Sequence, residues 1–387
     1  MGERSRRARA VAVTLSAVLS VTAACSFGPP DTEVAGQPPN LPAPSFSAGP
    51  DQDTSRQVAI TVLAKGLDVP WGMAFLPDGA ALVTERDTAR ILQVGPESDA
   101  EGLKVTEVQR LTEPVSGGDG GLLGIAVSPD YKTDKTVYVY YSTETDNRVA
   151  KLRLGGAPKP ILTGIPRSDD DNGGQLAFGP DGYLYVGTGD GTPKGTQAQN
   201  AKNLGGKILR MNTDGKPAPG NPVKKSLIWS SGHRNVQGFA WDTAKRMYAS
   251  ESDQKDFGEL NVIQKGKNYG WPTADGTAGN AEFTNPLTSW PLADSSCSGV
   301  AVLERIVAQA CPLGERVWLV STTGNGTVLG QPRSMLAGEY GRLRSLIAAP
   351  DGSLWVGTSN QERDGSPEPD DDQIIRLVFS DGGAGRS

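Results

Sequence analysis

The chain has 387 residues with 38 basic and 44 acidic side chains, one histidine and a formal net charge of −6. This acidic balance offers no broad basic surface to phosphate backbones, so nucleic acid is excluded as an expected partner. The single histidine, His233, excludes any site that needs two or three imidazole ligands.

Residues 1–25 are predicted to be a lipoprotein signal peptide outside the fold. Four arginines within the first nine residues precede a short apolar stretch, which is typical of an export signal and too short for a permanent membrane span. Residues 21–25 resemble a bacterial lipobox that ends in Cys25, the expected site of lipidation. The alternative is ordinary secretion with a free Cys25 thiol. We therefore expect an exported protein on the extracytoplasmic face of the cell membrane, attached through its lipid anchor only.

Residues 26–57 are predicted to form a disordered tether. Seven prolines lie there among small and polar residues, and such a segment has too little apolar surface to offset the entropy of ordering. Its prolines favour an extended, semi-rigid spacer between the anchor and the domain.

One phrase then recurs along the domain. It has the form Pro-Asp-Gly between two short apolar strands, and its first three copies begin at residues 75, 127 and 178, the second with Tyr131 in the place of the glycine. Another copy begins at Ala349, and residues 239–249 contain a degenerate one. Proline, aspartate and glycine suit the successive positions of a tight turn, so each copy predicts a β-hairpin.

A repeat of about 50 residues with several short strands is typical of a β-propeller. Residues 58–378 have room for six such units, so we predict an all-β, six-bladed β-propeller, with seven blades as the alternative. No segment shows a sustained helical period, which argues against α/β layers. The ring is expected to close by pairing its first and last segments, and residues 379–387 are predicted to be a disordered tail.

Two cysteines, Cys297 and Cys311, lie in the exported domain. A disulfide between them is expected in an oxidising compartment, and two buried thiols are the alternative.

A loop at residues 231–238 carries the densest polar chemistry. It places His233, Arg234, Asn235 and Gln237 just before a strand, where their side chains can present several hydrogen bonds. A polar network that ties two blades together is the alternative to a binding site.

This loop resembles the Gly-His-Arg-Asn-Pro-Gln-Gly signature of the soluble sugar dehydrogenases that use pyrroloquinoline quinone (PQQ). Further segments are similar to that family in the same order, namely residues 120–126, 172–182, 259–261 with 266–272, and 341–344. The resemblance covers roughly residues 58–378 and implies a six-bladed propeller that oxidises an aldose sugar or a related alcohol.

The resemblance also implies roles for single residues. Arg234 would face the quinone oxygen, and the remaining cofactor contacts are expected from Asp119, Asn235, Gln237, Arg342 and Arg344. Arginine suits the carboxylates of PQQ because its planar fork can donate two parallel hydrogen bonds. Ca²⁺ prefers oxygen ligands and is expected near Asp253 and Gln254, with a second, structural Ca²⁺ near Glu259 and Tyr269.

The sequence departs from this family at the expected base. The family has histidine before Asn-Gly-Gly, whereas this chain has Asp171. An aspartate with an ordinary pKa of about 3.9 is a weaker proton acceptor than imidazole. Asp119 stands where the family often has Glu or Gln, and the family's cofactor-binding lysine, expected near residues 321–325, is absent.

These residues support two main hypotheses. The first is an extracytoplasmic quinoprotein oxidoreductase with Asp171 as its catalytic base, impaired by the loss of histidine. The second is a non-catalytic cell-surface propeller that binds a sugar, a cell-wall fragment or a protein. Calcium-dependent lactone hydrolysis, which other six-bladed propellers perform, is a third reading without support from these motifs.

Overall fold

The computed structural model describes residues 45–46, 56–98, 102–192, 195–251, 257–277 and 281–381. The signal peptide with Cys25, most of the tether, and the calcium-loop residues Asp253 and Gln254 lie outside the described residues. Within the described part of the chain, no helix is long and apolar enough to cross a membrane.

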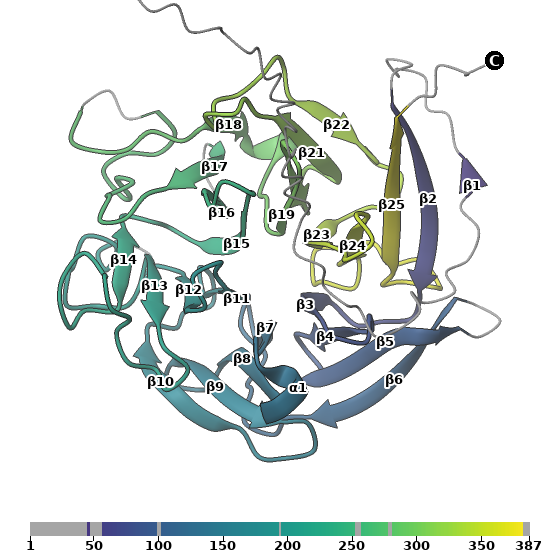
Figure 1. Ribbon diagram of the computed structural model, residues 1–387, viewed down its shortest axis with the longest axis horizontal. Helices are drawn as coiled ribbons and strands as arrows, with labels where there is room; N and C mark the ends of the chain where they lie inside the picture. The colour runs from purple at the N-terminus through teal and green to yellow at the C-terminus, as the bar shows by residue number, and fades with distance from the viewer. Residues whose placement is uncertain are drawn as a thin grey trace, which may run out of the picture. The chain divides into compact units, whose positions relative to one another are not determined.

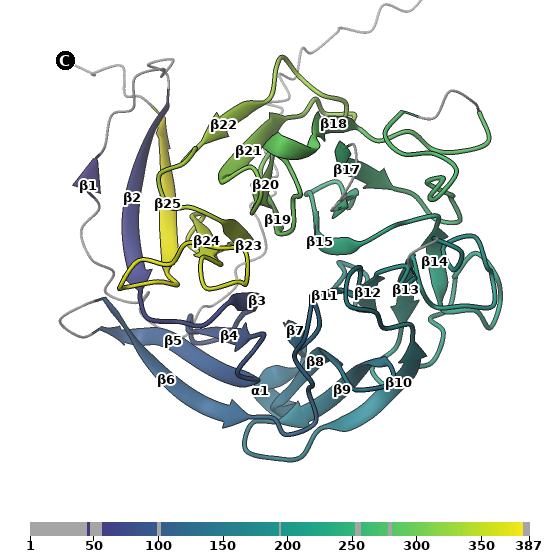
Figure 2. The same cartoon turned by 180° about the vertical axis from the view of Figure 1, so that it is seen from behind.

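The described residues form six β-sheets around a central axis, as Figures 1 and 2 show from opposite sides. We number the sheets as blades 1 to 6 and give the strands of each from the axis outwards. Blade 1 contains β3 (Pro70–Phe75), β4 (Ala81–Glu85), β5 (Arg90–Ser98) and β6 (Leu103–Arg110). Blade 2 contains β7 (Leu122–Val127), β8 (Thr136–Ser142), β9 (Asn147–Arg153) and β10 (Lys159–Ile165). Blade 3 contains β11 (Gly173–Phe178), β12 (Leu184–Thr188), β13 (Lys207–Met211) and β14 (Ile228–Ser231).

The second half of the ring repeats this order. Blade 4 contains β15 (Val236–Trp241), β16 (Met247–Glu251), β17 (Phe257–Ile263) and β18 (Thr288–Pro291). Blade 5 contains β19 (Val300–Leu303), β20 (Ile306–Cys311), β21 (Arg316–Ser321) and β22 (Arg333–Met335). Blade 6 contains β23 (Leu343–Ala348), β24 (Leu354–Thr358), β25 (Ile374–Asp381), β2 (Arg56–Ala64) and β1 (Ser45–Phe46). The helical elements among the described residues are α1 (Tyr131–Asp134) and the 3-10 turn η1 (Leu292–Asp294).

Blade 6 closes the ring by pairing the two ends of the domain. β2 is antiparallel to β25, from Arg56 opposite Asp381 to Ala64 opposite Ile374. Its innermost strand β23 also contacts β3 of blade 1. The expected six-bladed propeller and its mode of closure are therefore confirmed. The strands run from Arg56 to Asp381, slightly beyond the expected limits, and β1 lies inside the segment that was expected to be a tether.

The Pro-Asp-Gly phrases form the turns between the first and second strands, as predicted. In blades 1, 3 and 6 the glycine of the turn has positive φ, a region that glycine enters without steric cost. Blade 2 inserts α1 at this point, and blade 4 uses Lys245 with φ of 65°. In blade 5 the corresponding turn is a tight one at Glu304. This turn lacks the Pro-Asp-Gly phrase and was therefore not predicted from the sequence.

Apolar side chains pack between neighbouring blades and form the core. At the seam between the first and last blades, Phe75 meets the buried Trp355 edge-on, with ring centroids 4.9 Å apart. The expected disulfide joins Cys297 to Cys311, and both cysteines are fully buried.

The alternation of strands gives the propeller two different ends. The turn end carries the Pro-Asp-Gly turns. The entry end carries the loops that lead into each innermost strand, together with the turns between second and third strands. Asp119, Asp171, Asn235 and Arg342 each lie within three residues of the start of an innermost strand. The repeat therefore brings side chains that are far apart in sequence to the entry end.

Candidate functional site

A cavity of about 640 Å³ opens at the entry end. Five of the predicted site residues line it, namely Asp119, Asn235, Gln237, Arg342 and Arg344. Its other lining residues include Arg86, Asp170, Leu292, Leu313 and Glu362. This volume is in the range of small-molecule sites. A second cavity of about 660 Å³ lies at the turn end, and Gln237 and Arg344 line both cavities.

A carboxylate bound by three arginines forms one wall of the entry cavity. Glu362, in the loop between β24 and β25, contacts Arg86 Nη1 at 2.9 Å, Arg342 Nη2 at 2.9 Å and Arg344 Nη2 at 2.5 Å. Burial raises the pKa of Glu362, but the three arginines outweigh burial and bring the pKa down to about 2. This cluster joins blade 1 to blade 6. Neither Arg86 nor Glu362 was predicted from the sequence, although each follows the second strand of its blade and such positions belong to the entry end.

Arg344 has donors left over after these contacts. Its Nη1 donates to Gln237 Oε1 and to Ser298 Oγ, both at 3.3 Å, and Ser298 Oγ donates to Gln237 Oε1 at 2.6 Å. Its Nε is buried and has no hydrogen-bond partner. A buried donor without an acceptor is costly, so this position suits an anionic ligand group in the cavity.

Asn235 and Gln237 are each used partly by the protein. The side-chain oxygen of Asn235 accepts a hydrogen bond from the Gly173 amide at 2.8 Å, which ties blade 3 to blade 4. Gln237 accepts through its oxygen as described above. Both residues line the cavity, so their amide nitrogens are the donors that remain for a ligand.

Asp171 and Arg234 form a buried pair beside this cavity; they are next in sequence to its lining residues Asp170 and Asn235, but neither of them lines it. Arg234 Nε donates to Asp171 Oδ2 at 3.3 Å, and the guanidinium carbon lies 4.7 Å from the centre of the Trp271 ring. Asp171 has φ of 58°, a conformation that aspartate tolerates better than most residues. A Cβ atom at Gly189 would collide with the Asp171 carbonyl, so glycine is required there.

The second oxygen of this carboxylate is left unpaired by the protein. Asp171 Oδ1 is buried and has no hydrogen-bond partner. Burial raises the pKa of Asp171, Arg234 lowers it, and the nearby Asp119 and Asp170 raise it further, so that the pKa reaches about 6. Asp171 is therefore a stronger proton acceptor than an ordinary aspartate, and its pKa is close to that of imidazole.

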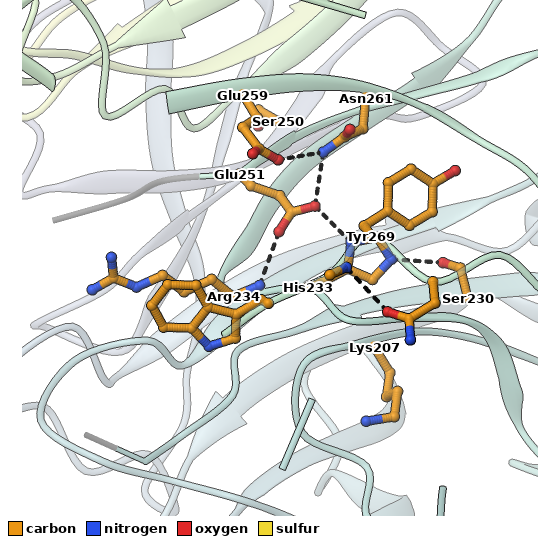
Figure 3. Close-up of polar contacts among 12 residues, drawn as sticks. Lys207, Ser230, His233, Arg234, Ser250, Glu251, Glu259, Asn261 and Tyr269 are labelled. Carbon is orange, nitrogen blue, oxygen red and sulfur yellow. Dashed lines mark hydrogen bonds and ion pairs between the residues drawn. The ribbon is translucent and has the colours of Figure 1, made fainter. Parts of the chain in front are cut away.

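His233 has a structural position rather than a place in the cavity. Figure 3 shows its ring between Glu251, 2.6 Å from Nδ1, and the Ser230 hydroxyl, 2.8 Å from Nε2. The ring is fully buried and stacks on Tyr269, with centroids 4.7 Å apart. His233 thus fixes the loop that carries Arg234.

Two glutamates, the buried Glu251 and the half-buried Glu259, lie beyond this histidine. Asn261 Nδ2 bridges them, at 2.9 Å from Glu251 Oε1 and 3.0 Å from Glu259 Oε2 (Figure 3). Burial and the neighbouring Glu251 raise the pKa of Glu259 to about 8. A cavity of about 20 Å³, lined by both glutamates, by Asp275 and by Arg234, lies beside them and has the size of one small ion or water.

These carboxylates fit a cation, but the side chains alone do not complete a calcium site. The Tyr269 hydroxyl already donates to the Val262 carbonyl at 2.6 Å and accepts from the Gln264 amide at 2.9 Å. Within the described ranges, no group of three His, Cys, Asp or Glu side chains is arranged to hold a metal. Any further ligands would have to be carbonyl groups, waters or residues outside these ranges.

The missing lysine has no bearing on the entry cavity. The loop after β21 lies at the turn end, where Arg246 Nη1 donates to the Gly324 carbonyl at 2.5 Å. The expectation that residues 321–325 face the cofactor site was therefore wrong. The positive charge of the cavity comes instead from Arg86, Arg342, Arg344 and the exposed Arg363.

Comparisons with known proteins identify the family to which this chain is similar. Residues 67–366 match the family model described as glucose/sorbosone dehydrogenase. The chain is 31% identical to quinoprotein glucose dehydrogenase B of Acinetobacter calcoaceticus over 60% of its length, and 31% identical to the aldose sugar dehydrogenase YliI of Escherichia coli over 56%. These matches span only 55% and 62% of the two relatives.

A solved structure matches more completely. The PQQ-bound form of an aldose sugar dehydrogenase from Streptomyces coelicolor is 42% identical, with a TM-score of 0.79. The match covers 87% of this chain and all of that structure.

Proposed function

Because this chain belongs to the glucose/sorbosone dehydrogenase family, we propose that it is a PQQ-dependent oxidoreductase that acts on an aldose sugar or a related alcohol. The observation that carries the proposal is the position of Asp171 beside Arg234, with one buried oxygen free to accept a proton.

The residues of the entry cavity fit an anionic cofactor. Arg344 has a buried Nε without an acceptor, and Arg342 lines the same wall. These two arginines would bind carboxylates of PQQ, while Asn235 and Gln237 would donate their amide hydrogens. When bound, PQQ supplies the two-electron acceptor for the hydride that leaves the substrate carbon.

Asp171 acts as the general base in this proposal. It takes the proton of the substrate hydroxyl on Oδ1, while Oδ2 remains hydrogen-bonded to Arg234. A base works best when its pKa is near the working pH, and burial has moved the pKa of Asp171 to about 6. The loss of the family histidine is thereby partly compensated, so we expect slow or narrow-specificity oxidation rather than an inactive protein.

Arg234 has two tasks. Its positive charge favours the ionised form of Asp171, and it stabilises negative charge that develops next to it. Trp271 and the His233 loop hold the guanidinium in place for both. Asp119 lines the entry cavity, and its charge acts on Asp171.

Calcium is the second cofactor that we propose. Glu251 and Glu259 repel each other when both are ionised, and a divalent cation next to them would remove that repulsion. The cofactor Ca²⁺ is proposed at Asp253 and Gln254 on the strength of the sequence alone.

We further propose that the protein acts outside the cytoplasm as a lipoprotein anchored at Cys25. The proposal rests on the sequence of residues 1–25, and the Cys297–Cys311 disulfide is compatible with an oxidising compartment.

A non-catalytic binding propeller is the second candidate, because Glu362 already neutralises part of the arginine cluster. Reconstitution with PQQ and Ca²⁺ distinguishes the dehydrogenase from the binding propeller. The purified protein, mixed with PQQ and Ca²⁺, should show a bound-quinone absorbance band that an aldose bleaches. Arg344→Met should abolish the band. If the wild-type protein does not bind PQQ at micromolar concentration with Ca²⁺ present, the dehydrogenase proposal falls and the binding module takes its place.

A further inference from the structure

Lys207 is a buried charge that the proposed mechanism does not use. This residue, labelled in Figure 3, begins β13 and is fully buried. Its ammonium donates to the carbonyl oxygens of Gln197 and Ala198, both at 2.8 Å, and of Gly205 at 2.6 Å. An ammonium group has three donors, so these carbonyls satisfy it completely. Burial lowers the pKa of Lys207 to about 8 and the nearby Asp190 opposes this effect, so the side chain is charged at neutral pH.

The three carbonyls belong to the loop between β12 and β13, which we call the blade-3 entry loop (residues 189–192 and 195–206). The fully buried Asp190 holds the same loop. Its Oδ2 accepts a hydrogen bond from the Ala198 amide at 2.6 Å, and its Oδ1 accepts one from the Thr192 hydroxyl. Buried carbonyl oxygens without a donor are costly, so the conformation of this loop depends on the Lys207 ammonium.

Backbone hydrogen bonds join the blade-3 entry loop to the segment that carries Arg234. The Asp190 amide donates to the Arg234 carbonyl at 2.7 Å, and the Gly232 amide donates to the Ala198 carbonyl at 3.2 Å. The Ala198 carbonyl therefore accepts both from the Lys207 ammonium and from the segment before Arg234. Lys207 and the backbone of that segment thus share one oxygen.

The same loop packs against the aromatic ring that stacks on Arg234. Gln199 of this loop is exposed, and its Nε2 donates to the Trp271 carbonyl at 2.6 Å. A Cβ atom at Gly195 would lie 2.5 Å from Trp271 Nε1, so the loop backbone is in close contact with the indole. The Trp271 ring lies 4.7 Å from the guanidinium carbon of Arg234, which donates to Asp171. A continuous series of contacts therefore leads from the buried ammonium to the Asp171–Arg234 pair.

We propose that Lys207 is a positioning residue for the Asp171–Arg234 pair: by ordering the blade-3 entry loop, it holds Trp271 and the Arg234 backbone in place. This inference rests on the proposed function for the chemistry of the pair, whereas its positional part concerns the protein without cofactor. A misplacement of about 1 Å at reacting groups can cost about 100-fold in rate. The contribution of Lys207 should therefore appear in turnover as well as in stability.

Urea denaturation without PQQ measures whether Lys207 and Trp271 act together. Lys207→Met and Trp271→Leu each remove part of the same series of contacts, so their effects on the unfolding equilibrium constant should not multiply. We expect the double variant to fall short of the product of the two single effects by at least about threefold. Lys151→Met, which removes the partner of Asp214 on blade 2, is the control and should combine with Trp271→Leu as a simple product within about twofold.

Steady-state oxidation of D-glucose by the PQQ-loaded protein separates positioning from a general loss of stability. Lys207→Met should lower kcat by about tenfold at saturating sugar. Its Kd for PQQ should stay within about threefold of the wild type, because the arginines proposed to bind the cofactor lie on blade 6. Asn221→Ala is the matched control: the buried Asn221 amide also donates to two carbonyls of blade 3, those of Arg210 and Ser226. It should lower stability and leave kcat unchanged.

Gln199→Ala provides a second variant that leaves the carbonyls around Lys207 in place. Because Gln199 is exposed, this variant should fold, and it removes the hydrogen bond to the Trp271 carbonyl. We expect kcat to fall by about threefold or more. Its effect on stability should also fail to multiply with that of Trp271→Leu. If Lys207→Met does not fold, the same two measurements on Gln199→Ala decide whether the loop positions the pair.

The outcomes separate this inference from the proposed function. If the effects of Lys207→Met and Trp271→Leu simply multiply, or if Lys207→Met turns over like the wild type, the inference is overturned and the dehydrogenase proposal stands. If Asn221→Ala loses as much turnover as Lys207→Met, the loss reflects stability alone and the inference is also overturned. If the wild type does not bind PQQ, the dehydrogenase proposal fails, and the stability measurements alone decide whether Lys207 acts on Trp271.

Discussion

Replacing Asp171 by asparagine should raise stability and abolish activity at the same time. Burial outweighs the pairing with Arg234 and moves the pKa of Asp171 from 3.8 to about 6. Each unit of pKa corresponds to about 1.4 kcal/mol, so the ionised carboxylate destabilises the fold by up to about 3 kcal/mol relative to its neutral form. Asparagine resembles the neutral form in shape and has no charge to bury.

The stability difference between the variant and the wild type depends on pH. Because the folded-state pKa is raised, the native state is most favoured below the unfolded pKa of 3.8, and this stability is lost as the pH rises through about 6. Asp171→Asn and the wild type should therefore be equally stable near pH 4. Above pH 7 the variant should be more stable by about 1–3 kcal/mol, the lower limit allowing for relaxation around Arg234.

Urea denaturation at the two pH values measures this difference, and sugar oxidation with PQQ measures activity. Loss of a general base should lower the oxidation rate by about 10²–10⁴-fold, while PQQ affinity stays within about twofold because the arginines hold the cofactor. Asp242→Asn removes a carboxylate whose pKa is lowered. It should change the stability in the opposite direction, that is, lower it at neutral pH. If Asp171→Asn is less stable than the wild type above pH 7, the carboxylate is stabilised by its surroundings and the reasoning fails.

Four further expectations concern other parts of the molecule. Glu362→Gln leaves the buried Arg86 and Arg344 and the half-buried Arg342 without their shared partner and should cost about 3–5 kcal/mol in unfolding free energy, with PQQ affinity measured alongside. Lys207 is fully buried with its ammonium bonded to three carbonyl oxygens, so Lys207→Met should lower stability by about 1–3 kcal/mol, whereas the more exposed Lys151→Met should change it by less than about 0.5 kcal/mol. Reduction of the disulfide, or Cys297→Ser, should lower the unfolding free energy by about 3 kcal/mol, and equal melting curves with and without reductant would contradict this. Cys25→Ala should move the protein from the detergent phase to the medium or leave it unprocessed, and unchanged fractionation would disprove the anchor.

Local sequence was sufficient to predict the architecture. The Pro-Asp-Gly phrase specifies a turn through the backbone preferences of its own residues, and its spacing of about 50 residues specifies one blade. The turn at Glu304 escaped because a two-residue hairpin needs no proline or aspartate.

The candidate site was only partly predictable. The repeat places residues just before each innermost strand at one end, which explains why Asp119, Asp171, Asn235 and Arg342 lie at the same end of the propeller. The turns between second and third strands lie at that same end, so the same rule would also have pointed to Arg86 and Glu362. Applied to residues 321–325, it would have placed that loop at the turn end.

The sequence by itself determined the repeat, the turns, the pair of cysteines and the identity of the acid at position 171, because these depend on residue type and spacing along the chain. Only the tertiary structure decided the strength of that acid and the partners of the arginines. A pKa depends on burial and on charges that come from other blades, and Asp171 meets Arg234 across 63 positions of sequence. Glu362 reaches Arg86 across 276 positions, so their pairing exists only once the ring has closed.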